Sequence, residues 1–217
     1  SYDQISKIKM KYLEFTDVEI HELKSEIIGE TFEILVKQPD PQILSLFGNK
    51  PLPVVYGTDA NLSAGGYINT LEGLLLGGEI PPVLFIGIRY KLGDEPDFMQ
   101  FVTSRTREFT PTEDVENQKL MEQMTLREVK GGGAENFLKF LTTELRDWVS
   151  ERFNVSDDTT YIGDSMGGLF GLYTLFTEPR AFKRYVIGSP WQEWNHPTTF
   201  ELEESYAENN NDMEAIV

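Results

Sequence analysis

The chain has 217 residues, 40% of them hydrophobic, which suffices for one domain with a sizeable core. Its formal net charge of −17 argues against nucleic acid as a partner, because a phosphate backbone would be repelled rather than neutralised. The absence of cysteine excludes disulfide bonds, thiolate catalysis and cysteine-based metal sites.

The N-terminal part predicts an antiparallel hairpin. Apolar and polar side chains alternate in VEIHELKSEII (residues 18–28) and again in TFEILVKQP (residues 31–39). A period of two in both segments, with the turn-like Gly29-Glu30 between them, is the pattern of two paired strands.

A strand–helix–strand unit follows. LPVVYGTD (residues 52–59) and PPVLFIGIRY (residues 81–90) are short apolar runs bounded by Pro, Gly or Asp, as expected for strands that are buried on both faces. The segment between them, residues 62–76, is long enough for a helix. Two such strands joined by a helix indicate a parallel pair.

Residues 91–133 interrupt this rhythm, because they are polar, carry Pro and Gly and lack a sustained period. A long segment without clear secondary structure is usually functional or disordered, so we expect a lid or active-site loop over the open end of the sheet. The triple glycine at residues 131–133 then starts a helix whose apolar stripe falls on Phe137, Leu141, Leu145 and Trp148.

The C-terminal part alternates again. TTYIGDSMGGLFGLYTLF (residues 159–176) predicts a strand, a tight turn and a helix, and RYVIGSP (residues 184–190) a buried strand. A helix is expected over residues 197–208, and MEAIV (residues 213–217) resembles the start of another strand. The whole pattern predicts a single α/β domain over residues 1–217, with a mostly parallel sheet led by the antiparallel hairpin.

The turn in GDSMG has a chemical interpretation. Gly163, Ser165 and Gly167 fit G-x-S-x-G, in which small flanking residues let a strand turn sharply into a helix and hold the serine in a strained conformation. The Met166 N–H would then point at a developing oxyanion from the positive end of the helix. A tight structural turn with a solvated serine remains the alternative.

A second oxyanion donor should come from the loop after an earlier central strand. The Asn61 backbone N–H is the candidate, with Asp59 shaping the turn. The alternative is an ordinary strand-to-helix loop in which Asn61 caps the helix.

Several segments together resemble the esterase D-like (putative esterase) family of α/β-hydrolases, which includes the trilactone siderophore esterases. They are YIGDSMGGLFGLYTLF, LPVVYGTDAN, RTREFTPT, GGGAENFLKFLTTELRDWV and IGSPWQEWN. The resemblance implies the α/β-hydrolase fold, with helices on both faces of the sheet. It also implies ester hydrolysis through an acyl-enzyme on Ser165, with Met166 and Asn61 as oxyanion donors. Ala60 stands where the family usually has Gly, which weakens the assignment of Asn61.

The family's triad also needs an acid and a histidine, in the chain order Ser, Asp/Glu, His. The family places both after later strands, whereas this sequence reaches Val217 at the start of the strand that should precede the acid. We therefore expect the last strands to be missing and the domain to be incomplete at its C-terminus. His21 belongs to the predicted hairpin, and His196 follows a strand end, where it would serve as a substitute base, cap a helix or line the pocket.

Three further side chains are candidates for substrate binding. Trp191 and Trp194 bracket the region beside Ser165, where they would line a pocket or only pack. Arg105 in the expected lid would bind an anionic substrate such as a catecholate siderophore.

The sequence thus predicts a serine esterase acting on a small-molecule ester, either a small acyl ester or a siderophore-type lactone. A non-catalytic binding domain of the same fold and a serine peptidase remain alternatives. No phosphate-cradling motif and no metal-ligand spacing occurs, so we expect no cofactor and no metal. Without an apolar run of ~18 residues or an N-terminal signal core, we expect no membrane span and favour the cytoplasm.

Overall fold

The computed structural model describes residues 17–93 and 97–210. Within them the strands form one sheet of six, in the order β1-β2-β4-β3-β5-β6. The bounds are β1 (Glu19–Lys24), β2 (Thr31–Lys37), β3 (Leu52–Gly57), β4 (Leu84–Tyr90), β5 (Val155–Asp164) and β6 (Arg184–Gly188). The strand expected at residues 213–217 lies outside the described residues.

The pairing confirms the predicted mixed sheet. β1 pairs with β2 and β2 with β4 in antiparallel fashion, whereas β4, β3, β5 and β6 run parallel to one another. The carboxyl ends of β3, β5 and β6 therefore meet at one edge of the sheet, which is where α/β sheets bind their ligands.

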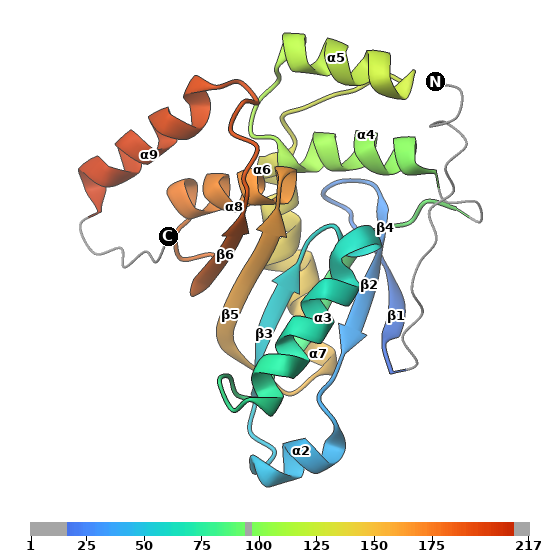
Figure 1. Ribbon diagram of the computed structural model, residues 1–217, viewed down its shortest axis with the longest axis vertical. Coiled ribbons are helices and arrows are strands. Elements are labelled where there is room, and N and C mark those ends of the chain that lie inside the picture. Colours follow the sequence, from blue (N-terminus) through green and yellow to red (C-terminus); the bar gives the residue numbers. More distant parts are fainter. Residues whose placement is uncertain (1–16, 94–96, 211–217) are drawn as a thin grey trace.

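Helices cover both faces of the sheet. α3 (Ala60–Leu76) lies on one face, and α8 (Met166–Thr177), α6 (Ala134–Phe140) and α7 (Arg146–Arg152) lie behind the strands (Figure 1). The short helix α2 (Pro41–Leu46) and the longer α9 (Pro197–Asn209) lie at opposite ends of the molecule.

Strand periodicity explains how each face is filled. Phe32, Ile34 and Val36 of β2 belong to the main core, while Leu35 between them contacts Ala60 and Ala64 of α3. Successive side chains of a strand point to opposite faces, so one strand supplies both layers.

The predicted helix after the triple glycine is confirmed, with an interruption. All four residues of its apolar stripe are at most 9% exposed. The helix passes through one π-helical turn, Leu141–Leu145, between α6 and α7. The stripe thus faces the main core, as its spacing indicated.

The expectation of a loop without regular structure over residues 91–133 is wrong. This segment forms α4 (Phe98–Phe109) and α5 (Val115–Thr125), above the carboxyl ends of the strands (Figure 1). The sequence pattern did not predict α4 because the buried side chains of this helix include Thr106 and Glu108 as well as Phe101 and Phe109, which interrupts the apolar period. Whether the segment acts as a lid stays a prediction.

Candidate active site

Ser165 lies at the turn between β5 and α8, in a backbone conformation that L-residues rarely adopt. Its φ is 58° and its ψ is −116°. The Ser165 N–H donates to the Gly188 carbonyl at 3.0 Å, and the Ser165 carbonyl accepts from the N–H groups of Trp191 and Leu169 at 3.0 and 2.9 Å. The side chain is partly exposed and makes no capping hydrogen bond. Hydrogen bonds to the surrounding backbone therefore maintain the strained conformation of Ser165. The Ser165 hydroxyl does not cap the helix.

The glycines of the turn are required by close contacts. A Cβ on Gly163 would lie 2.4 Å from the Tyr161 hydroxyl oxygen and 2.6 Å from the Gly167 carbonyl oxygen. A Cβ on Gly167 would lie 2.7 Å from Thr58 Oγ1, and one on Gly168 would lie 2.5 Å from the Gly188 oxygen. The predicted steric reason for the glycines is confirmed, and Gly168 is a third such position that the five-residue motif did not include.

Met166 is the first residue of α8, and it is 3% exposed. The first N–H groups of a helix have no intrahelical acceptor and carry the positive end of its dipole. The Met166 N–H is therefore in the position expected of an oxyanion donor, and its role in binding an oxyanion stays a prediction.

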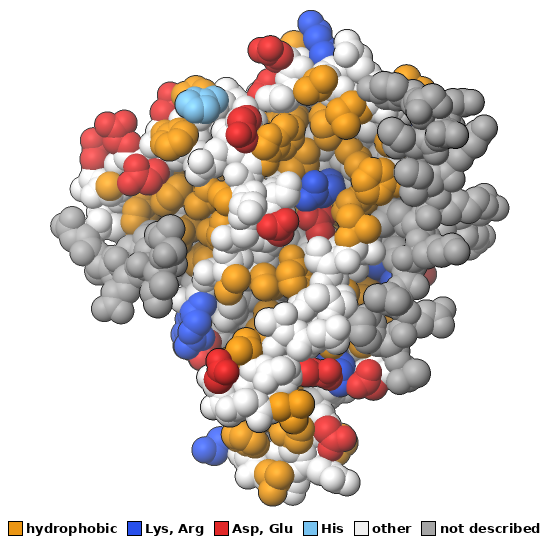
Figure 2. Space-filling model, viewed as in Figure 1, with side chains coloured by type: hydrophobic (Ala, Val, Ile, Leu, Met, Phe, Trp, Pro, Cys, Tyr) orange, Lys and Arg blue, Asp and Glu red, His pale blue; other side chains and the backbone are white. Residues whose placement is uncertain are grey.

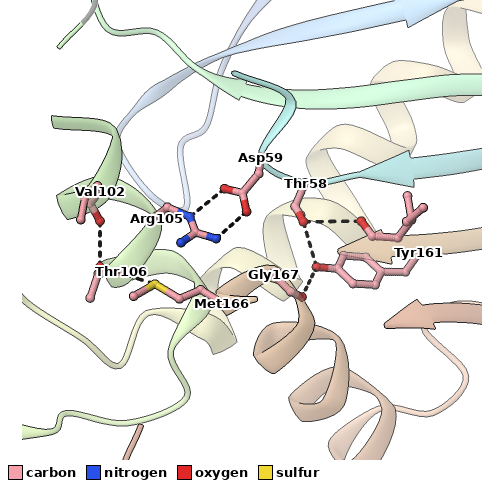
Figure 3. A network of polar contacts seen from close by, with 9 residues as sticks. Thr58, Asp59, Val102, Arg105, Thr106, Tyr161, Met166 and Gly167 are labelled. Atoms are coloured by element: carbon pink, nitrogen blue, oxygen red, sulfur yellow. Dashed lines mark hydrogen bonds and ion pairs between the residues drawn. The ribbon is translucent and has the colours of Figure 1, made fainter. Parts of the chain in front are cut away.

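The loop after β3 lies against this turn. Tyr161 donates a hydrogen bond from its hydroxyl to the Gly167 carbonyl at 2.6 Å, and its oxygen is 3.1 Å from Thr58 Oγ1 (Figure 3). Asp59 follows with a left-handed backbone, φ 55°, and is the residue that precedes α3. Its expected part in shaping the turn is confirmed.

Asp59 is held by Arg105 of α4. The Arg105 Nε and Nη2 groups donate to the two carboxylate oxygens at 2.9 and 2.6 Å (Figure 3). The guanidinium also lies 5.6 and 5.7 Å from the ring centres of Phe101 and Phe109. Burial raises the pKa of the Asp59 carboxyl, and the guanidinium opposes that rise. Arg105 thus binds the chain's own carboxylate here, and its predicted role in binding an anionic substrate stays a prediction.

Asn61 does not cap α3 with its side chain. Its Oδ1 accepts from the Tyr90 N–H at 2.8 Å, and its Nδ2 donates to the Tyr90 carbonyl at 3.0 Å, so the amide fastens the helix to the end of β4. Ala60, the departure from the family pattern, fits because Gly87 opposite it has no side chain; a Cβ there would lie 3.0 Å from that of Ala60. The role of the Asn61 N–H as an oxyanion donor stays a prediction.

The two tryptophans after β6 behave differently. Trp194 is completely buried and donates from Nε1 to the Thr112 carbonyl at 2.9 Å. This is the packing role that the sequence left open, and the side chain offers no surface to a substrate. Trp191 is partly buried, with its ring centre 5.7 Å from that of Trp194, and its role in lining a pocket stays a prediction.

Neither histidine contacts Ser165 in the described part of the chain. His21 lies on β1, at the far edge of the sheet, where it hydrogen-bonds to Glu19 at 2.9 Å. His196 precedes α9, is exposed, and its ring lies 5.4 Å from that of Phe200. It occupies the position before the helix but makes no side-chain capping bond. Neither ring can therefore be assigned as the base.

A groove of about 500 Å³ runs beside the turn. Its walls are the first half of α3, including Leu62 and Tyr67, and the ends of β5 and β6, including Asp164 and Gly188. On the same face, hydrophobic side chains gather over α4, above the strand ends (Figure 2). In the described ranges no set of three potential metal-ligating side chains comes together, and none of the helices is both long and apolar enough to cross a membrane.

Solved structures share this fold over nearly the whole chain. The BES protein from Bacillus cereus gives a TM-score of 0.71 at 25% identity, covering 93% of this chain and 71% of that one. The siderophore hydrolase EstB from Aspergillus nidulans gives a TM-score of 0.72 at 23% identity, covering 94% and 68%. The α/β-hydrolase fold, predicted from the strand pattern and the resemblance, is confirmed.

Sequence relatives agree. The ferri-bacillibactin esterase BesA of Bacillus subtilis is 36% identical over 154 residues, which are 67% of this chain and 50% of that protein. The siderophore triacetylfusarinine C esterase of Aspergillus fumigatus is 29% identical over 175 residues, which are 77% and 53%. The chain thus spans about half the length of these curated relatives. The family described as "Putative esterase" matches residues 25–215, and the chain therefore belongs to the putative esterase family.

Proposed function

We propose that this protein is a serine esterase that hydrolyses a carboxylic ester through an acyl-enzyme on Ser165. The observation that carries the proposal is the strained conformation of Ser165 at the start of α8, with its N–H and its carbonyl both fixed by neighbouring backbone. Such strain persists only where the surroundings over-determine it, and it is typical of nucleophile turns.

In the proposed reaction, Ser165 Oγ attacks the ester carbonyl carbon as a base takes the hydroxyl proton. The carbonyl oxygen becomes an oxyanion, which the N–H groups of Met166 and Asn61 stabilise. Collapse of the intermediate breaks the bond to the alcohol, which leaves with a proton, and water then hydrolyses the acyl-enzyme. No base is assigned, since no described histidine contacts Ser165.

The names of the relatives support a proposal for the substrate class. Both curated relatives are named as esterases of siderophores, and we propose a siderophore-type ester as the substrate here. The groove between α3 and the ends of β5 and β6 would receive part of it, because the residues that line it include Gly163 and Asp164, next to Ser165 in the chain. A small acyl ester is the other substrate to test.

A fluorophosphonate probe tests the mechanism on the full-length protein, because the probe reacts only with an activated serine. We expect labelling that disappears in Ser165→Ala and persists in Ser150→Ala, which removes an exposed serine on α7. Hydrolysis of a catecholate trilactone should fall by roughly 10⁴-fold or more in Ser165→Ala. A folded wild-type protein without labelling would contradict the proposal and favour a non-catalytic binding domain.

A further inference from the structure

The turn that holds Ser165 depends on the chain that follows β6. One of its anchors is the Gly188 carbonyl at the end of β6, and another is the Trp191 N–H three residues later. Residues 189–195, here called the anchor loop, follow Gly188 directly and include Trp191, so the loop contacts the Ser165 backbone.

The anchor loop is itself strained. Ser189 and Asn195 have φ values of 36° and 42°, which non-glycine residues rarely adopt. A conformation of this kind costs of order 1–3 kcal/mol per residue and persists only where other contacts impose it. At Asn195 and the neighbouring Trp194, such contacts come from the segment around α5.

Several contacts join the anchor loop to that segment, among them a hydrogen bond of 3.3 Å from Asn117 Nδ2 to the Glu193 carbonyl. The Asn195 N–H donates to Asp114 Oδ2 at 2.6 Å, and Asn195 Nδ2 donates to Thr112 Oγ1 at 2.8 Å. Trp194 Nε1 donates to the Thr112 carbonyl, and the indole fills the space beside Gly131, where a Cβ would lie 2.6 Å from Cζ2. A completely buried indole fixed in this way leaves the anchor loop little freedom.

Asp114 forms hydrogen bonds both with the start of α5 and with the anchor loop. Its Oδ1 accepts from the Asn117 N–H at 3.0 Å and caps α5, while its Oδ2 receives both the Asn195 N–H and the Asn117 side-chain amide. Burial alone would raise the pKa of Asp114, but these hydrogen bonds to the ionised form leave it below its ordinary value. The carboxylate is thus held charged between the start of α5 and the anchor loop.

We propose that Asp114 and Thr112 are positioning residues for Ser165, which clamp the anchor loop so that it imposes the strained conformation of the nucleophile. The α5 segment then stabilises the backbone around Ser165 through the anchor loop. The effect on reactivity rests on the proposed function, whereas the effect on the Ser165 backbone does not.

The test compares three variants of the full-length protein. Asp114→Asn keeps an acceptor for the α5 cap but puts an amide donor opposite the Asn195 N–H. Thr112→Val removes the Oγ1 acceptor and keeps the main-chain carbonyl that Trp194 uses. Asp40→Asn is the matched control, since Asp40 caps α2 through the Gln42 N–H at 2.7 Å, and α2 lies at the end of the molecule away from α5 (Figure 1).

Two measurements decide the outcome. The rate of inactivation by a fluorophosphonate should fall between about 10-fold and 100-fold in Asp114→Asn, as expected for a misplaced nucleophile, and by less than about 2-fold in Asp40→Asn. Hydrogen exchange at the amides of Ser165 and Trp191 should become faster in Asp114→Asn and Thr112→Val but not in the control.

Each result has one meaning. Unchanged exchange at Ser165 and Trp191 in both variants, with α5 locally loosened, would overturn the inference. If the wild-type protein does not react with the probe, the proposed function fails, and the exchange measurement alone supports or overturns the clamp. A variant that unfolds is replaced by the other one, because each removes a different hydrogen bond.

Discussion

The Glu108 carboxyl on α4 should make the stability of this protein fall as the pH rises toward neutrality. Its side chain is 2% exposed. One carboxylate oxygen, Oε1, accepts from Arg107 Nε at 2.7 Å and lies 2.6 Å from Arg107 Nη2. The other, Oε2, is buried without a partner among the described residues. Burial raises the pKa of Glu108 from 4.5 to about 7, although Arg107 opposes the rise.

The direction of this change in stability follows from the number of protons that the folded and unfolded states bind. Between pH 4.5 and about 7 the folded protein keeps a proton on Glu108 that the unfolded chain has released, so the free energy of unfolding decreases as the pH rises. At about 1.4 kcal/mol per pH unit, the whole effect is about 3 kcal/mol, complete above pH 7 and absent below pH 4.5.

Urea unfolding of the wild-type protein and of Glu108→Gln between pH 4.5 and 8.5 measures this. The wild-type free energy of unfolding should fall relative to that of Glu108→Gln by about 3 kcal/mol over that interval. Taking the difference removes the contributions of other groups. Glu204→Gln, at an exposed position on α9, should run parallel to the wild type. Parallel curves for Glu108→Gln as well would refute the reasoning.

Two further substitutions probe the site directly. Gly163→Ala should destabilise the protein by about 1–3 kcal/mol and abolish probe labelling, because its Cβ would meet the Tyr161 hydroxyl and the Gly167 carbonyl. Gly66→Ala is the control: its Cβ would meet nothing within 4 Å outside the helix's own backbone, so it should stabilise α3 by up to about 1 kcal/mol. Equal effects of the two substitutions on urea unfolding would contradict the steric argument. Arg105→Ala should lower the free energy of unfolding by about 3–5 kcal/mol, because it leaves the buried Asp59 carboxylate unpaired. In a double-mutant cycle, adding Asp59→Asn should recover much of that loss, whereas additive losses would show that the pair is not coupled.

Local patterns in the sequence predicted most of the sheet and the tight turn at Ser165. The hairpin and the buried strands were recognisable because alternation and apolar runs have direct physical causes in a half-buried or fully buried strand. The turn at Ser165 was recognisable because the glycines around it are required by contacts within a few residues, such as that between Gly163 and Gly167.

The same patterns did not predict which tertiary contacts the side chains of the middle and C-terminal segments make. Arg105 was a candidate for binding substrate, but the fold brings it to Asp59, 46 positions away, and no local signal marks such a pair. Trp194 was a candidate for lining a pocket, and its burial beside Gly131 depends on contacts between the chain after β6 and the residues around α5.

The sequence by itself therefore determined most of the strands, the helices that follow them and the glycine-rich turn at Ser165, because those depend on interactions between near neighbours in the chain. Only the tertiary structure decided that Arg105 of α4 binds Asp59 in the loop after β3, and that the segment around α5 contacts the anchor loop. These contacts join residues roughly 50 to 80 positions apart, and their partners are set by how the layers pack around the sheet.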